Sequence, residues 1–71
     1  MGNIRMKFIK VDGNQPTYLN ADHIIRLFVK DNFVLIQTRN DTFSTEYYRE
    51  NDSEELAKSD LLGIICYLND D

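Results

Sequence analysis

The feature that most constrains this chain is a pair of apolar runs separated by only two residues. Residues 24–30 and 33–38 are rich in Ile, Leu, Val and Phe, and Asp31-Asn32 lies between them. Branched and aromatic side chains favour strands, and Asp and Asn tolerate the positive φ angles of a two-residue hairpin turn. The pattern therefore predicts an antiparallel hairpin with a type I′ turn.

A second polar pair, Asn40-Asp41, predicts another two-residue turn, which leads into a strand over residues 43–50. The two turns determine the cross-strand pairs. The expected pairs are Val29 with Val34, Leu27 with Ile36, Ile25 with Thr38, Thr38 with Phe43, Ile36 with Thr45, and Val34 with Tyr47. Because side chains alternate along a strand, all of these residues share one side of the sheet, which should be the core side.

Two further strands precede this hairpin. Residues 6–11 alternate apolar side chains with Lys, and the Asp12-Gly13 pair that follows is a strong signal for a two-residue turn. The returning strand, residues 15–19, contains Pro16. Proline has no N–H to donate, so this strand is expected at an edge, or the proline at a strand start.

A single helix closes the chain. Asp52-Ser-Glu-Glu55 has the pattern of a capping box with Asp52 as the N-cap residue, and Glu54 complements the helix dipole. Apolar residues then recur on one helical face. They are Ala57, Leu61, Ile64, Ile65 and Leu68. We therefore expect an α+β fold in one domain over residues 1–71, a small curled antiparallel β-meander of about five strands with one C-terminal helix packed on one face. Met6 is an alternative start, which would make residues 1–5 a disordered leader.

The other side of the predicted sheet is mixed. Its polar residues are Arg26, Lys30, Gln37, Ser44 and Glu46. It also carries four large apolar side chains, with Phe28 expected opposite Leu35 and Phe33 opposite Tyr48. One helix cannot cover both sides of a sheet. These four residues therefore either bind a partner or are covered by the first hairpin in a small barrel.

The helix is also apolar beyond its core stripe. Leu62 and Cys66 flank the stripe, and Leu56 and Tyr67 point away from it, which is typical of a helix enclosed on more than one side. A chain this short buries a small core, and a lone cysteine offers no internal disulfide. The sequence thus predicts a homo-oligomer, most simply a two-fold dimer. The predicted interaction surface consists of Phe28, Phe33, Leu35, Tyr48, Leu62 and Tyr67.

Charge is distributed unevenly along the chain. The net charge is −4, with an excess of cations in residues 1–40 and of carboxylates in residues 41–71. An acidic chain argues against non-specific nucleic-acid binding. The alternative function is nonetheless binding of single-stranded nucleic acid or DNA on the mixed face, where aromatic rings would stack on bases and Arg26 and Lys30 would contact the backbone. Glu46 lies in the same surface and opposes that role.

No motif for catalysis or cofactor binding stands out. The polar corner at residues 20–23 contains the only histidine, His23, beside Asp22, but adjacent residues seldom face each other and no nucleophile is placed nearby. We expect a structural corner in which Asn20 and Asp22 hold backbone groups. Cys66 lies in an apolar run and should behave as a small hydrophobe. We predict a non-enzymatic protein with no catalytic residue, no metal site and no cofactor.

Targeting signals are also missing from the pattern. The longest apolar run, residues 61–68, is interrupted by Gly63 and is far too short to span a bilayer. The amino end lacks the apolar stretch of a signal peptide. We therefore expect a cytoplasmic protein that does not contact membranes.

The order of these elements, together with YLNADHI at residues 18–24, resembles the short FlbD-type flagellar or swarming-motility proteins. That family has an opening strand, a turn with Asn-Gly or a similar pair, an aromatic-x-Leu-Asn-Ala/Pro-x-x-Ile corner and a Glu-rich helix start, which correspond to residues 7–11, 12–13, 18–24 and 53–56. In the corner, Tyr18 directly precedes Leu19, without the intervening residue of the pattern. The resemblance implies a bacterial protein that acts through protein contacts, in a family with no assigned enzyme activity. Residues 39–42 depart from the pattern, because they lack the glycine usual in that turn. The middle of the chain is also similar to the first half of a LytTR-type DNA-binding domain, without its basic second half.

Overall fold

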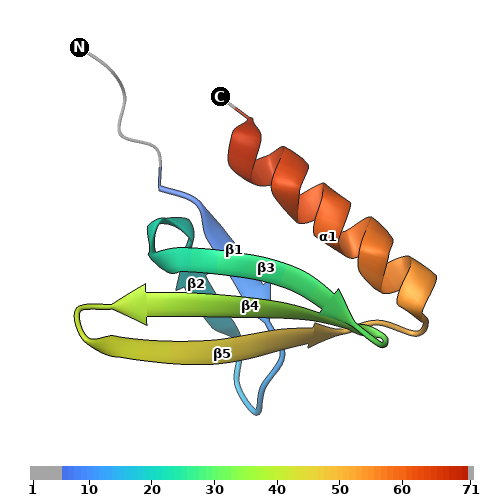
Figure 1. The fold of residues 1–71 in the computed structure, drawn as a ribbon, viewed down its shortest axis with the longest axis horizontal. Coiled ribbons are helices and arrows are strands. Elements are labelled where there is room, and N and C mark those ends of the chain that lie inside the picture. The colour runs from blue at the N-terminus through green and yellow to red at the C-terminus, as the bar shows by residue number, and fades with distance from the viewer. Residues whose placement is uncertain (1–5, 71) are drawn as a thin grey trace.

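The computed structural model describes residues 6–70, which form five strands and one α-helix (Figure 1). In chain order the elements are β1 (Phe8–Val11), β2 (Thr17–Asn20), the 3-10 turn η1 (Ala21–His23), β3 (Ile24–Lys30), β4 (Phe33–Asn40), β5 (Phe43–Glu50) and α1 (Glu54–Asn69). All strand pairs are antiparallel. The expected α+β class with one C-terminal helix is confirmed. The expected leader, residues 1–5, lies outside the described residues.

The strands form two sheets joined at one corner. β1 pairs with β2, and β3, β4 and β5 form a three-stranded sheet with β4 in the centre. Asp12, at the end of β1, joins the two sheets: its N–H donates to the carbonyl of Tyr48 at 3.0 Å, and its carboxylate accepts from the N–H of Glu50. Beyond this junction, the β1–β2 hairpin crosses behind the larger sheet in the view of Figure 1.

The connection between β1 and β2 is longer than predicted. Val11 pairs with Thr17, so residues 12–16 form a five-residue loop and not a two-residue turn at Asp12-Gly13. A two-residue turn would place Pro16, which lacks an N–H, within the hydrogen-bonded ladder. In the observed loop Pro16 immediately precedes β2, in agreement with its predicted place at a strand start.

The β3–β4 hairpin follows the predicted register near its turn and departs from it at the other end. The pairs Val29–Val34 and Leu27–Ile36 are confirmed. A β-bulge between Ile24 and Arg26 then adds one residue to β3. As a result Ile24, and not Ile25, lies opposite Thr38. Ile24 packs against the core, whereas Ile25 is 57% exposed, so the predicted core position of Ile25 is wrong.

The β4–β5 turn lies one residue later than predicted. Asn40 pairs with Phe43, so the turn residues are Asp41-Thr42 and not Asn40-Asp41. Each predicted pair is displaced by two residues: Thr38 faces Thr45, Ile36 faces Tyr47, and Val34 faces Arg49. A two-residue displacement leaves every side chain on its predicted side, because the alternation has a period of two. The predicted pairs of β4 with β5 are wrong, whereas the predicted side of each residue is correct. Phe43, next to the turn, is 76% exposed, so its predicted core position is wrong.

Both turns of the larger sheet have a positive φ angle at their first central residue only. Asp31 and Asp41 each have φ of 55°, and Asn32 and Thr42 do not have positive φ. A type I′ turn needs positive φ at both central residues, whereas type II′ needs it at the first alone. The predicted type I′ geometry is therefore wrong for the first turn, although its two-residue length is right.

The N-cap of α1 lies one residue later than predicted. Ser53 is the N-cap residue, and its hydroxyl accepts a hydrogen bond from the N–H of Leu56 at 3.1 Å. The predicted capping box with Asp52 as N-cap is therefore wrong. Glu54 and Glu55 still lie in the first turn, where the helix dipole favours carboxylates.

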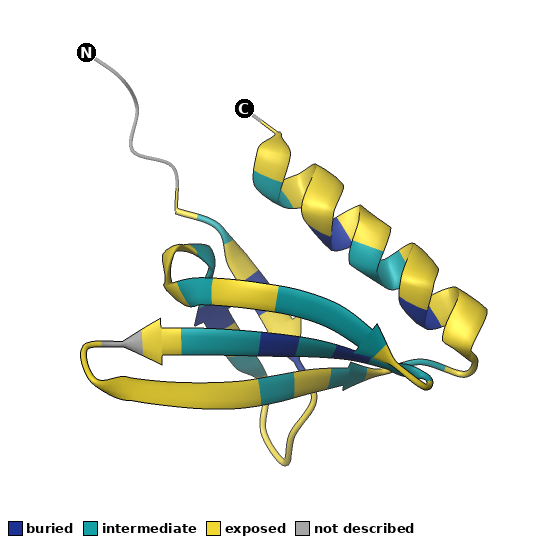
Figure 2. Ribbon diagram, in the orientation of Figure 1, coloured by how far each residue is buried: buried dark blue, intermediate teal, exposed yellow. Residues whose placement is uncertain are grey.

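α1 and the β1–β2 hairpin cover the same side of the three-stranded sheet, the inner face. The buried core draws on all three parts and consists of Ile9, Val11, Leu19, Val34, Ile36, Ala57 and Ile64. Figure 2 shows that most of the outer circumference of α1 is exposed, while its buried positions lie toward the sheet. The opposite side of the sheet, the outer face, contributes no residue to this core.

Candidate functional site

The outer face presents a regular grid of side chains from three strands. Residues directly opposite one another in an antiparallel sheet point to the same side, so the two registers define cross-strand rows. The rows are Arg26–Gln37–Glu46, Phe28–Leu35–Tyr48 and Lys30–Phe33–Glu50. We call these nine residues the outer grid. Its middle row is apolar, and charged side chains flank that row on both outside strands.

Aromatic contacts organise the grid. The rings of Phe33 and Tyr48 meet edge to face, with their centroids 5.6 Å apart. The guanidinium carbon of Arg26 lies 4.5 Å from the centroid of the Phe28 ring. Both contacts join neighbouring side chains of the grid, and a surface whose side chains already contact one another can be covered by a partner with little rearrangement.

Ile25 extends the apolar surface at the end of the grid. The bulge turns its side chain outward, where it lines a shallow hollow with Gln37 and Glu46. The amide of Gln37 donates a hydrogen bond to the carboxylate of Glu46 at 3.1 Å. Strand alternation gives no signal for this position, because it assumes an uninterrupted strand.

Four of the six predicted interaction residues come together in the grid. Phe28, Phe33 and Leu35 are half-buried by their neighbours, and Tyr48 is 45% exposed. The predicted pairing of Phe33 with Tyr48 is wrong, since Phe33 faces Glu50 and Tyr48 faces Leu35. The alternative in which the first hairpin covers these residues does not hold either, because that hairpin packs on the inner face.

The other two predicted interaction residues, Leu62 and Tyr67, lie on α1 and do not join the grid. Their five-residue separation places them about 140° apart around the helix. Leu62 is 62% exposed. The hydroxyl of Tyr67 accepts a hydrogen bond from the N–H of Phe8 at 3.3 Å. Tyr67 therefore contributes to the fold and does not form one surface with Leu62.

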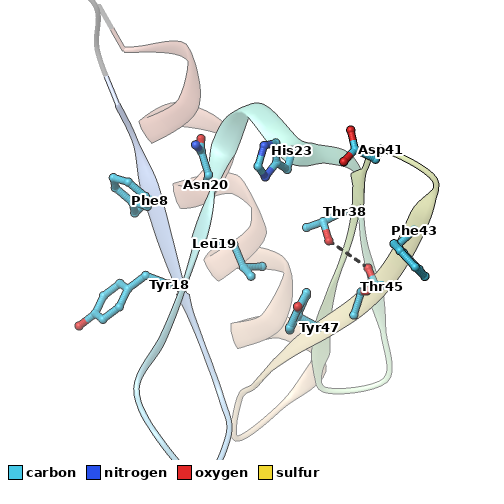
Figure 3. A pocket seen from close by; sticks show the side chains of 10 residues that line it. All are labelled: Phe8, Tyr18, Leu19, Asn20, His23, Thr38, Asp41, Phe43, Thr45 and Tyr47. Carbon is cyan, nitrogen blue, oxygen red and sulfur yellow. Dashed lines mark hydrogen bonds between the residues drawn. The ribbon is translucent and has the colours of Figure 1, made fainter.

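The predicted polar corner lies beside a groove of about 610 Å³ between the β1–β2 hairpin and the β4–β5 turn (Figure 3). Asn20 acts as expected, since its side chain accepts the N–H of Asp22 at 2.9 Å. His23 lines the groove near Asp41 and is exposed, and no hydrogen bond joins its ring to Asp22. A general base needs a positioned partner or nucleophile. Asp41 and the hydroxyls of Thr38 and Thr45 also line the groove, but among the described residues no hydrogen bond joins the His23 ring to any of them.

The sequence pattern did not predict two contacts that anchor α1. Arg49 of β5 forms a bidentate pair with Asp60 of α1, with both N–O distances 2.9 Å, and also donates to the carbonyl of Lys10 at 3.1 Å. The ammonium of Lys7 donates to carbonyl groups at the C-terminal end of α1, among them that of Tyr67 at 2.7 Å. A signal for the first contact exists in the sequence: alternation puts Arg49 on the apolar side, where a cation needs an acidic partner.

Comparisons with models of known protein families, with curated proteins and with solved structures found no match. In residues 6–70 no group of His, Cys, Asp and Glu side chains is arranged to hold a metal ion. The same residues include no helix with the length and apolar character needed to cross a membrane. Residues 6–70 thus form a small α+β domain in which the helix and the first hairpin cover one sheet face and no described element covers the other.

Proposed function

We propose that this chain is a non-enzymatic protein-interaction module that self-associates through the outer grid. The observation that carries the proposal is the placement of α1 and the β1–β2 hairpin on one face of the sheet. This placement leaves Phe28, Phe33, Leu35 and Tyr48 without cover from the other described elements. Adjacent large apolar groups on one face usually mark an interaction site, because removing apolar area from water is favourable by roughly 25 cal/mol per Å², before the opposing costs of association.

The small core supports the same function. Among the described residues, seven hydrophobic side chains are buried. A chain of this length gains limited stability from its own core, and a second subunit is one of the few available supplements. A second copy stacked on the outer face would bury the apolar side chains of the outer grid, which are otherwise partly exposed.

Sedimentation velocity on the full chain, from a few micromolar to about 300 µM, tests self-association over the range expected of a small interface. Tyr48→Glu and Phe33→Glu place a carboxylate on the grid. Leu62→Glu places the same charge on a more exposed apolar position of α1. We expect dimers for the wild type and Leu62→Glu, and monomers with near-native circular dichroism for the two grid variants.

Two outcomes contradict the proposal. One is a wild-type chain that stays monomeric throughout this concentration range. The other is loss of association in Leu62→Glu with no change in Tyr48→Glu, which would move the interface from the sheet to the helix.

One observation favours nucleic acid as a second candidate partner: Arg26 stacks on Phe28, and Lys30 lies on the same face. The grid also carries Glu46 and Glu50, however, so its cations and carboxylates are equal in number. Fluorescence anisotropy with a labelled oligothymidine at low salt tests this hypothesis, and binding that Arg26→Ala/Lys30→Ala abolishes would support it. A FlbD-type role and a cytoplasmic location remain predictions that rest on the sequence alone.

A further inference from the structure

The charges of the outer grid are sorted by strand. Both cations, Arg26 and Lys30, lie on β3, and both carboxylates, Glu46 and Glu50, lie on β5. The three grid positions of β4, between these strands, are uncharged. The four charged side chains are exposed. The grid is therefore a face with a basic edge, an apolar and uncharged centre, and an acidic edge.

A face with this layout is complementary to a copy of itself. When two such sheets stack about a two-fold axis parallel to β4, β3 of each copy lies over β5 of the other. We propose that two copies of this chain pair in this way, with Arg26 against Glu46 of the partner subunit and Lys30 against Glu50 of the partner subunit. The inference rests on the proposed function and adds to it the orientation of the two copies.

The apolar centre also matches in this orientation. An axis parallel to the strands places each cross-strand row over the same row of the partner subunit. Phe28 therefore stacks on the partner's Tyr48. Leu35 meets the partner's Leu35 on the axis. The other face-to-face dimer has its axis perpendicular to the strands and places β3 over β3 and β5 over β5. Like charges would then face each other at both edges, which is unfavourable.

Sheet twist leaves these pairs within reach. Stacked sheets cross at about 30°, which displaces a residue one strand and one row from the centre of the grid by roughly 4 Å, less than the ~4.8 Å between strands and the ~6.6 Å between successive rows. Arg39, opposite Ser44, lies on β4 just beyond the grid and near the axis, so the two copies of Arg39 repel each other weakly. Arg39→Gln should accordingly tighten the dimer by about twofold.

The interface is small. Three strands of seven or eight residues offer a planar footprint of roughly 350 Å² per copy at ~4.8 Å between strands and ~3.3 Å per residue. The two copies together offer roughly 700 Å², which is below the ~1,000 Å² in total that specific interfaces usually bury, so this pairing is a weak one. We expect a dissociation constant in the micromolar range that rises with salt, because the edge pairs are exposed to solvent.

Three charge variants of the full chain test the orientation. Arg26→Glu/Lys30→Glu makes both edges acidic, and Glu46→Lys/Glu50→Lys makes both edges basic. The fourfold exchange of these residues restores opposite edges and keeps the wild-type net charge of −4. By sedimentation, each double variant should raise the homodimer dissociation constant at least about tenfold, and the exchange variant should stay within about threefold of the wild type. Calorimetric titration of one double variant into the other should yield a heterodimer of near wild-type affinity.

The readouts separate this inference from simpler explanations. If net charge alone governed association, the neutral Glu46→Lys/Glu50→Lys chain would dimerise more strongly than the wild type. If the grid were a nucleic-acid surface, the same variant would bind oligonucleotides more tightly. Either result overturns the proposed pairing. Homodimerisation unchanged in both double variants but abolished by Tyr48→Glu also overturns the orientation and leaves the proposed function standing. If Tyr48→Glu has no effect either, both fail.

Discussion

The rings of Phe33 and Tyr48 meet edge to face, with 82° between their planes, although the two residues are not paired across the sheet. Phe33 lies opposite Glu50, and Tyr48 lies opposite Leu35, so the aromatic contact runs diagonally between two rows. Diagonal neighbours in a sheet are about 7–8 Å apart at the backbone, which is within reach of aromatic side chains. The contact links the apolar row of the outer grid to the row that carries Lys30.

This contact should be measurable as a coupling free energy. We expect Phe33→Leu and Tyr48→Leu to be coupled by about 0.5–1 kcal/mol in a double-mutant cycle, because edge-to-face pairs stabilise beyond their buried area. Urea unfolding at a concentration that keeps the chain monomeric provides the measurement. Phe28 and Tyr48 are separated by β4, so the matched cycle between them should give a coupling near zero. Equal coupling in both cycles would contradict the diagonal contact.

The bulge in β3 predicts opposite roles for two adjacent isoleucines. Ile24 packs against the core and Ile25 is exposed. Ile24→Ala should lower the free energy of unfolding by about 1.5–3 kcal/mol, and Ile25→Ala by less than about 0.5 kcal/mol. Thermal and urea unfolding of the two variants gives the comparison. A larger loss of unfolding free energy for Ile25→Ala than for Ile24→Ala would contradict the bulge and support the uninterrupted strand that alternation predicts.

The start of α1 can be tested in the same manner. Ser53→Ala should lower the free energy of unfolding by about 1 kcal/mol, because it removes the hydroxyl that accepts the N–H of Leu56. Asp52→Ala removes a carboxylate beside the helix dipole and should cost no more than about 0.3 kcal/mol. If the Asp52 variant were the less stable of the two, the cap would have to be reassigned to that residue.

The pair between Arg49 and Asp60 should be the strongest polar link between α1 and the sheet. Its side chains are 31% and 19% exposed, so its contribution is smaller than that of a fully buried pair. Asp60→Ala and Arg49→Ala should each lower the free energy of unfolding by about 1–2 kcal/mol, with a coupling of about 1 kcal/mol between them. Lys58→Ala, on an exposed position of α1, is the control and should be nearly neutral. Absence of coupling would mean that water replaces the pair without loss.

Much of the outer grid could be predicted from local patterns. Alternation along residues 33–38 and 43–50 placed Phe33, Leu35 and Tyr48 on the face opposite the core, and the structure confirms that placement. The predicted side of each residue is correct although the predicted turn is wrong, because moving a two-residue turn by one position shifts the register by two residues. Sequence alone could not place Glu50 in the grid, since the predicted register paired Phe33 with Tyr48.

The anchors of α1 could not be predicted in the same way. Arg49 and Asp60 are eleven residues apart and belong to different elements. Lys7 and the end of α1 are about sixty residues apart in the chain. No local periodicity relates such residues, and only the packing of the helix on the inner face brings them together.

The sequence by itself determined the strands, the α-helix and, outside the bulge in β3, which side of each long strand points inward, because these depend on neighbours two to four residues away. Tertiary structure decided the register of β5, the bulge in β3 and the face that the first hairpin covers. The β5 register places Tyr47 against the core and Arg49 within reach of Asp60. The free energy of contacts between distant segments exceeds the free-energy difference between two adjacent placements of the turn. The tertiary contacts therefore determine where the turn lies.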